Sequence, residues 1–395
     1  MSDTIALAKQ SRNAVMAMFF IAGVALSTWI ARLPALRDNL DIDTLQVGIF
    51  LFGGGAGSLL GLSVAAAIVS RIGERLAITI FGILAILGMG LVGILSIALP
   101  IFLVGFGAVF IFGFGMSVLD VAMNLEGARV ERGLNTPIMP LLHAMFSIGA
   151  LIGALIAAGA SAVNVEVNWH FGVMAAILVP VTLWVTKSIP DNDDYLVEPG
   201  AKRPSMRREL LSVWREPRTL AIGVIALAMA FAEGSATDWL ALGMVDDRGA
   251  SNATAAVWFV LFSLAMAAGR ISGVPLLARF GRLKVLAGAA MAAVAGIALL
   301  IVVDSTWAAV VAVILWGLGA SLGFPVAMSA AADEPAKGPA RVSVVATIAY
   351  GAFLVGPPTL GALGQAVGIL NSLWVVAGLI VLSLLAIPQA KKPDA

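Results

Sequence analysis

The sequence predicts an all-α membrane protein with twelve transmembrane helices in two pseudo-symmetric six-helix halves. Three observations predict this fold class. The chain of 395 residues is 60% hydrophobic and 12% charged, with a mean hydropathy of +1.01, whereas soluble domains carry about 25% charged residues. The apolar residues gather in blocks, and a span of the bilayer needs about 20 of them. Short segments of the first half also recur in the second half.

Composition excludes several function classes. The 24 basic and 23 acidic residues leave a net charge of +1, without the basic stripe of a nucleic-acid binder. The absence of cysteine excludes disulfide scaffolds and thiolate metal sites. Two histidines, His143 and His170, are too few for a multi-histidine metal site. We therefore expect no enzymatic activity, no metal or other cofactor and no nucleic-acid partner.

Twelve apolar blocks are long enough to be spans. The first block has no charge from Asn13 to Ala31, so it is too long for a signal peptide, and we expect it to be retained. Small residues that let helices approach closely recur at four-residue spacing in the second and fifth blocks. The expected spans are 13–32, 44–69, 76–97, 100–125, 141–163, 169–186, 219–243, 253–277, 285–303, 307–330, 342–363 and 371–387.

The distribution of Lys and Arg predicts the orientation. Outside the spans, only Arg32, Arg37 and Arg248 lie on the side opposite to the N-terminus. Basic residues favour the cytoplasmic side, so we expect both termini in the cytoplasm and the chain in the cell inner membrane. The expected domains are an N-terminal half (1–187), a cytoplasmic linker (188–218) and a C-terminal half (219–395).

Four pairs of segments repeat in the same order, with offsets of 205 to 210 residues. They are TWIA with DWLA, SRIGERL with ARFGRLK, VAMN with VAMS, and FSIGALIG with FLVGPPTL. Over nearly its full length, this arrangement of two parallel six-span repeats resembles the major facilitator superfamily. The resemblance implies the major facilitator fold, a substrate cavity between the halves and alternating access. We expect a monomer in the lipid bilayer.

The loops after the second and eighth spans resemble the signature loop of that superfamily in degenerate form. Arg71 and Gly73 stand in the first loop, and Arg279 and Gly281 in the second, but Ser70 replaces the usual Asp of the pattern. We predict gating or structural roles for these residues. We predict the same for Arg270, which lies within the eighth span.

The fourth span resembles the fucose–proton symporter branch. The segment GMSVLDVAMNLEG places Asp120 at the acidic position and Asn124 at the Asn position. In the next span, HAMFSIGALIGA also resembles a group of uncharacterised bacterial permeases. The acid expected in the first span is missing, since Ser27 stands near that place. The resemblance implies a sugar-like solute.

Ionisable residues inside spans are costly and usually mark a pathway or a proton relay. We predict proton coupling by Asp120 in span four and Glu233 in span seven. Residues that we expect around the substrate cavity are polar or aromatic and lie on the same or neighbouring spans: Trp29, Arg32, Ser117, Asn124, His143, Thr237, Asp238 and Trp316.

The predicted function is secondary active transport, by proton symport, of a small polar solute, with a sugar-like solute favoured. Two alternatives stay open. One is a proton-driven antiporter that exports drugs or metabolites, although the Gly-Pro-Pro run VGPPTLG lies in span eleven rather than in span five. The other is a membrane receptor that transports nothing.

Overall fold

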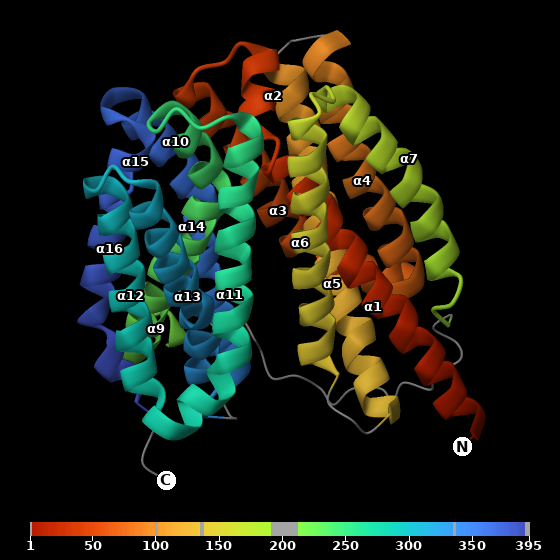
Figure 1. Cartoon of the computed structure of the whole chain (residues 1–395). Coiled ribbons are helices and arrows are strands. Elements are labelled where there is room, and N and C mark those ends of the chain that lie inside the picture. The colour runs from red at the N-terminus through yellow and green to blue at the C-terminus, as the bar shows by residue number, and fades with distance from the viewer. Residues whose placement is uncertain (1, 99–101, 135–137, 191–211, 335–336, 392–395) are drawn as a thin grey trace. The chain divides into compact units, whose positions relative to one another are not determined.

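The structure, a computed structural model, describes residues 2–98, 102–134, 138–190, 212–334 and 337–391. The chain divides into two compact units. Unit 1 comprises Met1–Glu198 together with Ser251–Val257, and unit 2 comprises Pro199–Ala250 together with Trp258–Ala395. Most of the expected linker, 191–211, lies outside the described residues. In each unit, the described helices run roughly side by side as a bundle (Figure 1).

Unit 1 holds seven described helices, one of which is short. They are α1 (Ser2–Ile30), α2 (Leu33–Leu40), α3 (Thr44–Ile72), α4 (Glu74–Ala98), α5 (Phe102–Leu134), α6 (Met139–Ala162) and α7 (Val167–Thr186). The first turn of α3 is fixed by a capping box, in which the Asp43 side chain accepts from the backbone of Gln46 and the Gln46 side chain from that of Asp43. This reciprocal pair satisfies two backbone donors that would otherwise lack partners.

The remaining described helices belong mainly to unit 2. They are α9 (Pro217–Ser235), a π-helical turn (Ala236–Leu240), α10 (Ala241–Asp246), α11 (Asn252–Phe280), α12 (Arg282–Val302), α13 (Thr306–Ala331), α14 (Gly338–Val367), α15 (Ile369–Ser372), α16 (Trp374–Leu384) and a 3₁₀ turn (Ile387–Ala390). The π turn interrupts one continuous run of helix from α9 to α10.

Eleven of the described helices are long and apolar enough to cross a membrane. They correspond to the first eleven predicted spans. The twelfth predicted span is an apolar segment divided into α15 and α16 at Leu373. The short helix α2 was not predicted, because its sequence, LPALRDNL, is only eight residues long and of mixed polarity. The chain is thus a multi-pass membrane protein.

Both units pair their helices in the same order. In unit 1, α1 packs against α6, and α4 against both α5 and α7. In unit 2, α9 packs against α14, and α12 against both α13 and α16. The structural repeat that the short sequence matches predict is therefore present in the packing of each unit.

Glycines allow the closest of these contacts. A Cβ atom added at Gly61 of α3 would lie 2.7 Å from the carbonyl oxygen of Phe114 in α5. One added at Gly153 of α6 would lie 2.6 Å from the carbonyl oxygen of Val24 in α1. The four-residue glycine spacing therefore does place backbones in contact, as expected of small residues between membrane helices.

One glycine joins two helices at the same place in each unit. Gly73 lies between α3 and α4 with φ 81° and ψ 160°, and Gly281 lies between α11 and α12 with φ 76° and ψ 161°. Side chains disfavour this positive φ, which glycine adopts readily. In each of the degenerate signature loops, a single residue joins the two helices, and both loops keep the glycine that this conformation requires.

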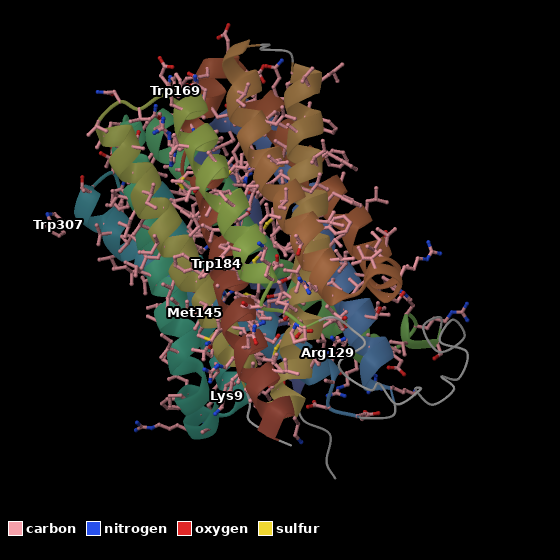
Figure 2. All side chains as sticks on the ribbon, turned by 90° about the vertical axis from the view of Figure 1, so that its right-hand side faces the viewer. Lys9, Arg129, Met145, Trp169, Trp184 and Trp307 are labelled. Atoms are coloured by element: carbon pink, nitrogen blue, oxygen red, sulfur yellow. The ribbon has the colours of Figure 1, made fainter. Side chains whose placement is uncertain are left out.

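Several tryptophans lie at the outer surface. Trp169 and Trp184 of α7 and Trp307 of α13 are strongly exposed, and the side chain of Trp307 stands clear of the ribbons in Figure 2. Trp at the ends of membrane helices is typical of the boundary between lipid and water. Trp169 and Trp307 fit this role because each begins its helix.

Candidate functional site

The middle of α5 carries the first candidate group. Asp120 is exposed, and Asn124, one turn later, is half-buried. The Asn124 amide donates to the Asp120 carboxylate at 3.0 Å and to the Asp120 carbonyl at 2.8 Å. Ser117 is half-buried on the same helix. The i, i+4 spacing of the predicted polar stripe thus forms an orienting hydrogen bond on an exposed aspartate within a membrane span.

Three other predicted cavity residues of unit 1 lie apart from this stripe. Trp29 is 5% exposed and packs against two phenylalanine rings of neighbouring helices. Arg32, between α1 and α2, is 4% exposed, and its Nη2 donates to the carbonyl of Val165 at 2.6 Å. These placements favour packing roles. His143 of α6 is exposed, with its ring edge against Phe19.

Unit 2 brings together two ionisable residues that lie on different spans. Nη2 of Arg270 in α11 donates to both carboxylate oxygens of Glu233 in α9, at 3.1 and 3.3 Å. The Arg270 side chain is 37% exposed and that of Glu233 is 26% exposed. Thr237 donates to the backbone carbonyl of Glu233, so it leaves the carboxylate to Arg270. The predicted relay residue and a predicted gating residue therefore form one accessible ion pair.

Arg270 also lines a cleft of about 560 Å³. The cleft is bounded by α11, α13 and the start of α12. Its lining is mostly apolar, with polar groups from two arginines and one serine: Arg270, Gly273, Leu277, Arg282, Leu322, Pro325, Val326 and Ser329. This volume and this mixture of apolar walls with a few polar groups are typical of sites for small molecules.

The remaining predicted cavity residues of unit 2 surround the start of the π turn. Asp238 lies within the turn and is half-buried. Trp316 of α13 is fully buried, stacks edge-on against Phe262, and donates from Nε1 to the carbonyl of Ala232 at 3.1 Å. This placement favours a core role for Trp316 over the predicted cavity role. π turns are often found at functional sites.

The predicted gating arginines at the helix ends are exposed. Arg71 lies in the last turn of α3 and Arg279 in the last turn of α11. The Arg279 guanidinium lies 5.3 Å from the centre of the Phe280 ring. The ion pairs at these joints involve other residues.

A buried network fixes the joint in unit 1. Arg129 of α5 bonds Glu74, the first residue of α4, at 2.5 Å and Glu126 at 3.2 Å. Glu126 is fully buried and also accepts from the Ser11 hydroxyl of α1 at 2.5 Å. The signal in the sequence was the i, i+3 spacing of Glu126 and Arg129, but the contributions of Ser11 and Glu74 come from distant parts of the chain.

The joint in unit 2 holds the corresponding pair with exchanged charges. Arg282 is the first residue of α12 and binds Asp333, just after α13, through two hydrogen bonds of 2.7 and 2.9 Å. Asp333 is 6% exposed and also binds Arg218. Burial opposes ionisation of Asp333, but the hydrogen bonds and charges of Arg282 and Arg218 lower its pKa overall.

A second charged cluster surrounds the start of α9. Glu216 binds Arg341 and Lys337 at 2.7 Å each. The hydrogen bond from Arg341, followed by those from Lys337 and Thr219, lowers the pKa of Glu216 to about 2 against the opposing effect of burial. This cluster ties the starts of α9 and α14 together at the end of the unit.

A family model described as Major Facilitator Superfamily matches residues 224–394. A protein described as an uncharacterized MFS-type transporter of Yersinia pestis is 30% identical over 381 residues, which cover 95% of this chain and 93% of that protein. Membrane protein MosC of Rhizobium meliloti is 25% identical over 379 residues, which cover 94% of this chain and 89% of that protein.

Two solved structures show the same fold at low identity. A crystal structure of the nucleoside transporter NupG matches with a TM-score of 0.81 and 12% identity, covering 97% of this chain and 100% of that one. A structure of the fucose:proton symporter FucP of E. coli matches with a TM-score of 0.65 and 17% identity, covering 97% and 98%. These matches confirm the predicted fold class.

Proposed function

Because the chain belongs to the major facilitator superfamily, we propose that it is a proton-coupled secondary transporter that moves a small polar solute by alternating access. The observation that carries this proposal is the set of accessible ionisable groups inside the spans. An ionisable side chain at the middle of a membrane helix costs roughly 2.5–3.5 kcal/mol on insertion scales. Asp120 is exposed, and the pair of Glu233 with Arg270 is partly exposed.

Accessibility separates these three residues from a structural network. Glu126 shows the structural alternative, since it is sealed in the core with an arginine and a serine. Asp120, by contrast, is an exposed residue, and its carboxylate accepts a hydrogen bond from Asn124 rather than an ion pair from an arginine that the structure shows. We assign proton coupling to Asp120 and Glu233, and solute contacts to Asn124, Ser117 and the half-buried residues of the π turn.

The solute class comes from the resemblance of α5 to the fucose–proton symporter branch. The fold match to FucP supports the shared architecture and is silent on the solute. We favour a sugar-like solute taken up by symport, in the cell inner membrane, by a monomer with both termini in the cytoplasm. The basic residues of the loops support this orientation.

Reconstitution into proteoliposomes tests the proposal. Radiolabelled candidate solutes are first found by their effect on the melting temperature of the purified chain, because ligands stabilise the folded state. An imposed proton gradient should then drive accumulation against the solute gradient, and a protonophore should abolish it. Accumulation driven from the opposite face would favour the efflux antiporter, and a bound solute that is never exchanged would favour the receptor.

A further inference from the structure

The ion pair of Glu233 with Arg270 is built differently from the other ion pair at the cleft. Arg282 uses two nitrogens to bind both oxygens of Asp333, at 2.7 and 2.9 Å, and Asp333 is 6% exposed. Arg270 uses one nitrogen at 3.1 and 3.3 Å, and both partners are at least a quarter exposed. Two parallel short bonds make the stronger pair. Arg270 is therefore the arginine of the cleft whose partner is more easily replaced.

The two arginines also lie far apart along the cleft. About ten residues of α11 separate Arg270 from the end of that helix, roughly 15 Å at 1.5 Å per residue. A small solute held at Arg270 therefore leaves Arg282 and Asp333 undisturbed. The walls between the two arginines are mostly apolar, with Leu277 and Leu322 among them. An arginine with an easily replaced partner, at one end of such a cleft, favours a ligand that carries a negative charge at one end.

We propose that the solute carries a carboxylate group that takes the place of Glu233 on Arg270, and that the released Glu233 takes up the coupled proton. This inference rests on the proposed function. The exchange balances: the arginine keeps one carboxylate partner throughout, and Glu233 gains one proton from water as the solute binds. One anion and one proton then enter the site together, so its net charge does not change. The reverse exchange returns both.

The surroundings of Glu233 suit this exchange. Among the described helices packed on α9, α13 and α16 contain no charged residue, and the charge of α14 is Arg341, which binds Glu216 and Glu334. Tyr350 of α14 stacks on a phenylalanine ring. Asp238 lies five residues further along the same run of helix. Within the described chain, Arg270 is the cation that binds Glu233, so a carboxylate that replaces Glu233 on Arg270 leaves Glu233 without that partner.

The test uses pairs of sugars and sugar acids that differ in one group. Glucose is compared with glucuronate, and galactose with galacturonate, by calorimetry and by melting temperature on the full-length purified chain. We expect binding of at least one acid and weaker or absent binding of its neutral counterpart. Calorimetry in two buffers of different ionisation enthalpy should show uptake of about one proton per acid bound.

Three variants separate the parts of the exchange. Arg270→Gln should weaken acid binding by more than about tenfold, because a charge-assisted hydrogen bond is lost. Glu233→Gln should bind the acid about tenfold or more tightly, with no proton uptake, because the competing carboxylate is gone. The double variant places two neutral amides opposite each other. It shows how the acid binds when both charges of the ion pair are absent. Lys284→Gln removes an exposed charge of α12 that does not line the cleft, and this variant should bind as wild type.

Several results would overturn the inference. They are acid and neutral ligands that bind equally, a panel in which no acid binds, acid binding that survives Arg270→Gln, and proton uptake that survives Glu233→Gln. The proposed function fails separately. If neutral sugars are accumulated by a proton gradient while acids are ignored, transport stands and the anion exchange is wrong. If acids bind through Arg270 but no gradient drives their accumulation, the exchange stands and coupled transport is wrong.

Discussion

Nε1 of Trp316 donates a hydrogen bond of 3.1 Å to the backbone carbonyl of Ala232, and so joins α13 to α9 at the residue before Glu233. The indole is fully buried. The same carbonyl also accepts from the backbone of Ala236, where the π turn begins. The core therefore fixes the backbone from which the Glu233 side chain reaches Arg270.

Two tryptophan substitutions should have different effects on stability. Trp316→Phe keeps most of the ring but removes the donor to Ala232, so we expect a loss of about 0.5–1.5 kcal/mol in addition to the loss of packing. Trp239 is equally buried, but its Nε1 has no hydrogen-bond partner in the described residues. Trp239→Phe should therefore cost less. Thermal unfolding of the purified variants compares them, and equal losses would contradict the role of the bond.

Asp120→Asn should abolish uphill transport driven by protons and preserve at least part of the solute exchange. The asparagine can still bond Asn124 but cannot release a proton. Accumulation and counterflow are measured in the same proteoliposomes. Asp38→Asn is the control, since Asp38 is an exposed acid in α2, outside the spans. Normal uphill accumulation by Asp120→Asn would show that another group carries the proton.

Two glycines of α6 provide a test of the helix contacts. A Cβ at Gly149 would collide with the carbonyl of Phe20, whereas one at Gly159 would meet nothing within 4 Å. Gly149→Ala should therefore destabilise by about 1–3 kcal/mol through overpacking. Gly159→Ala should be neutral or slightly stabilising, because alanine is the better helix former. The melting temperatures of both variants are measured in the same detergent. Equal effects of the two substitutions on stability would rule out a close contact of α1 with α6 at Gly149.

The buried network of unit 1 should respond unequally to the loss of its two half-buried members, Arg129 and Glu74. Arg129→Gln leaves the fully buried Glu126 without its arginine, so we expect a loss of about 3–5 kcal/mol. Glu74→Gln should cost less, because Arg129 keeps Glu126. Adding Glu126→Gln to Arg129→Gln should restore part of the stability, since the amide can still accept from Ser11. The melting temperatures of the variants are compared. If the double variant is no more stable than Arg129→Gln, the predicted role of the buried charge is wrong.

Acid should weaken the cluster around Glu216. Its pKa in the folded state is about 2, lowered chiefly by Arg341, against an ordinary value of 4.5. A lowered carboxyl pKa stabilises the folded state fully above the ordinary pKa, and this contribution is lost as pH falls through the folded value. Wild type should therefore lose stability between about pH 4.5 and 2. Glu216→Gln should be less stable at neutral pH and should show less of this loss, as followed by thermal unfolding at each pH.

The spans and the repeat could be predicted from the sequence, because lipid selects long apolar segments and because short matches recur at a constant offset. The break in the last span at Leu373 could not, since no charge or proline marks it. The ion pair of Glu233 with Arg270 could be suspected only as two separate charges. These two residues are 37 positions apart in the sequence, and their contact depends on how α9 and α11 pack.

Aromatic residues were the least predictable part of the site. Trp29 and Trp316 were placed at the cavity because indoles can stack on sugars, yet both are buried in their own unit. A tryptophan in a membrane helix has the same neighbours in sequence whether it faces a core or a pathway. Polar residues at helical spacing were more informative: Asp120 and Asn124 do lie on one stripe and bond each other.

The exchanged charges at the two joints limit how far the halves can be interchanged. Glu74 faces Arg129 in one unit, and Arg282 faces Asp333 in the other. A chimera that replaced α4 with α12 would set Arg282 against Arg129, and the converse chimera would set Glu74 against Asp333. Conversion of either joint into the other takes two substitutions, and reversing the charge of one partner first sets like charges against each other. A chimera of the two halves should therefore exchange both partners of a joint together.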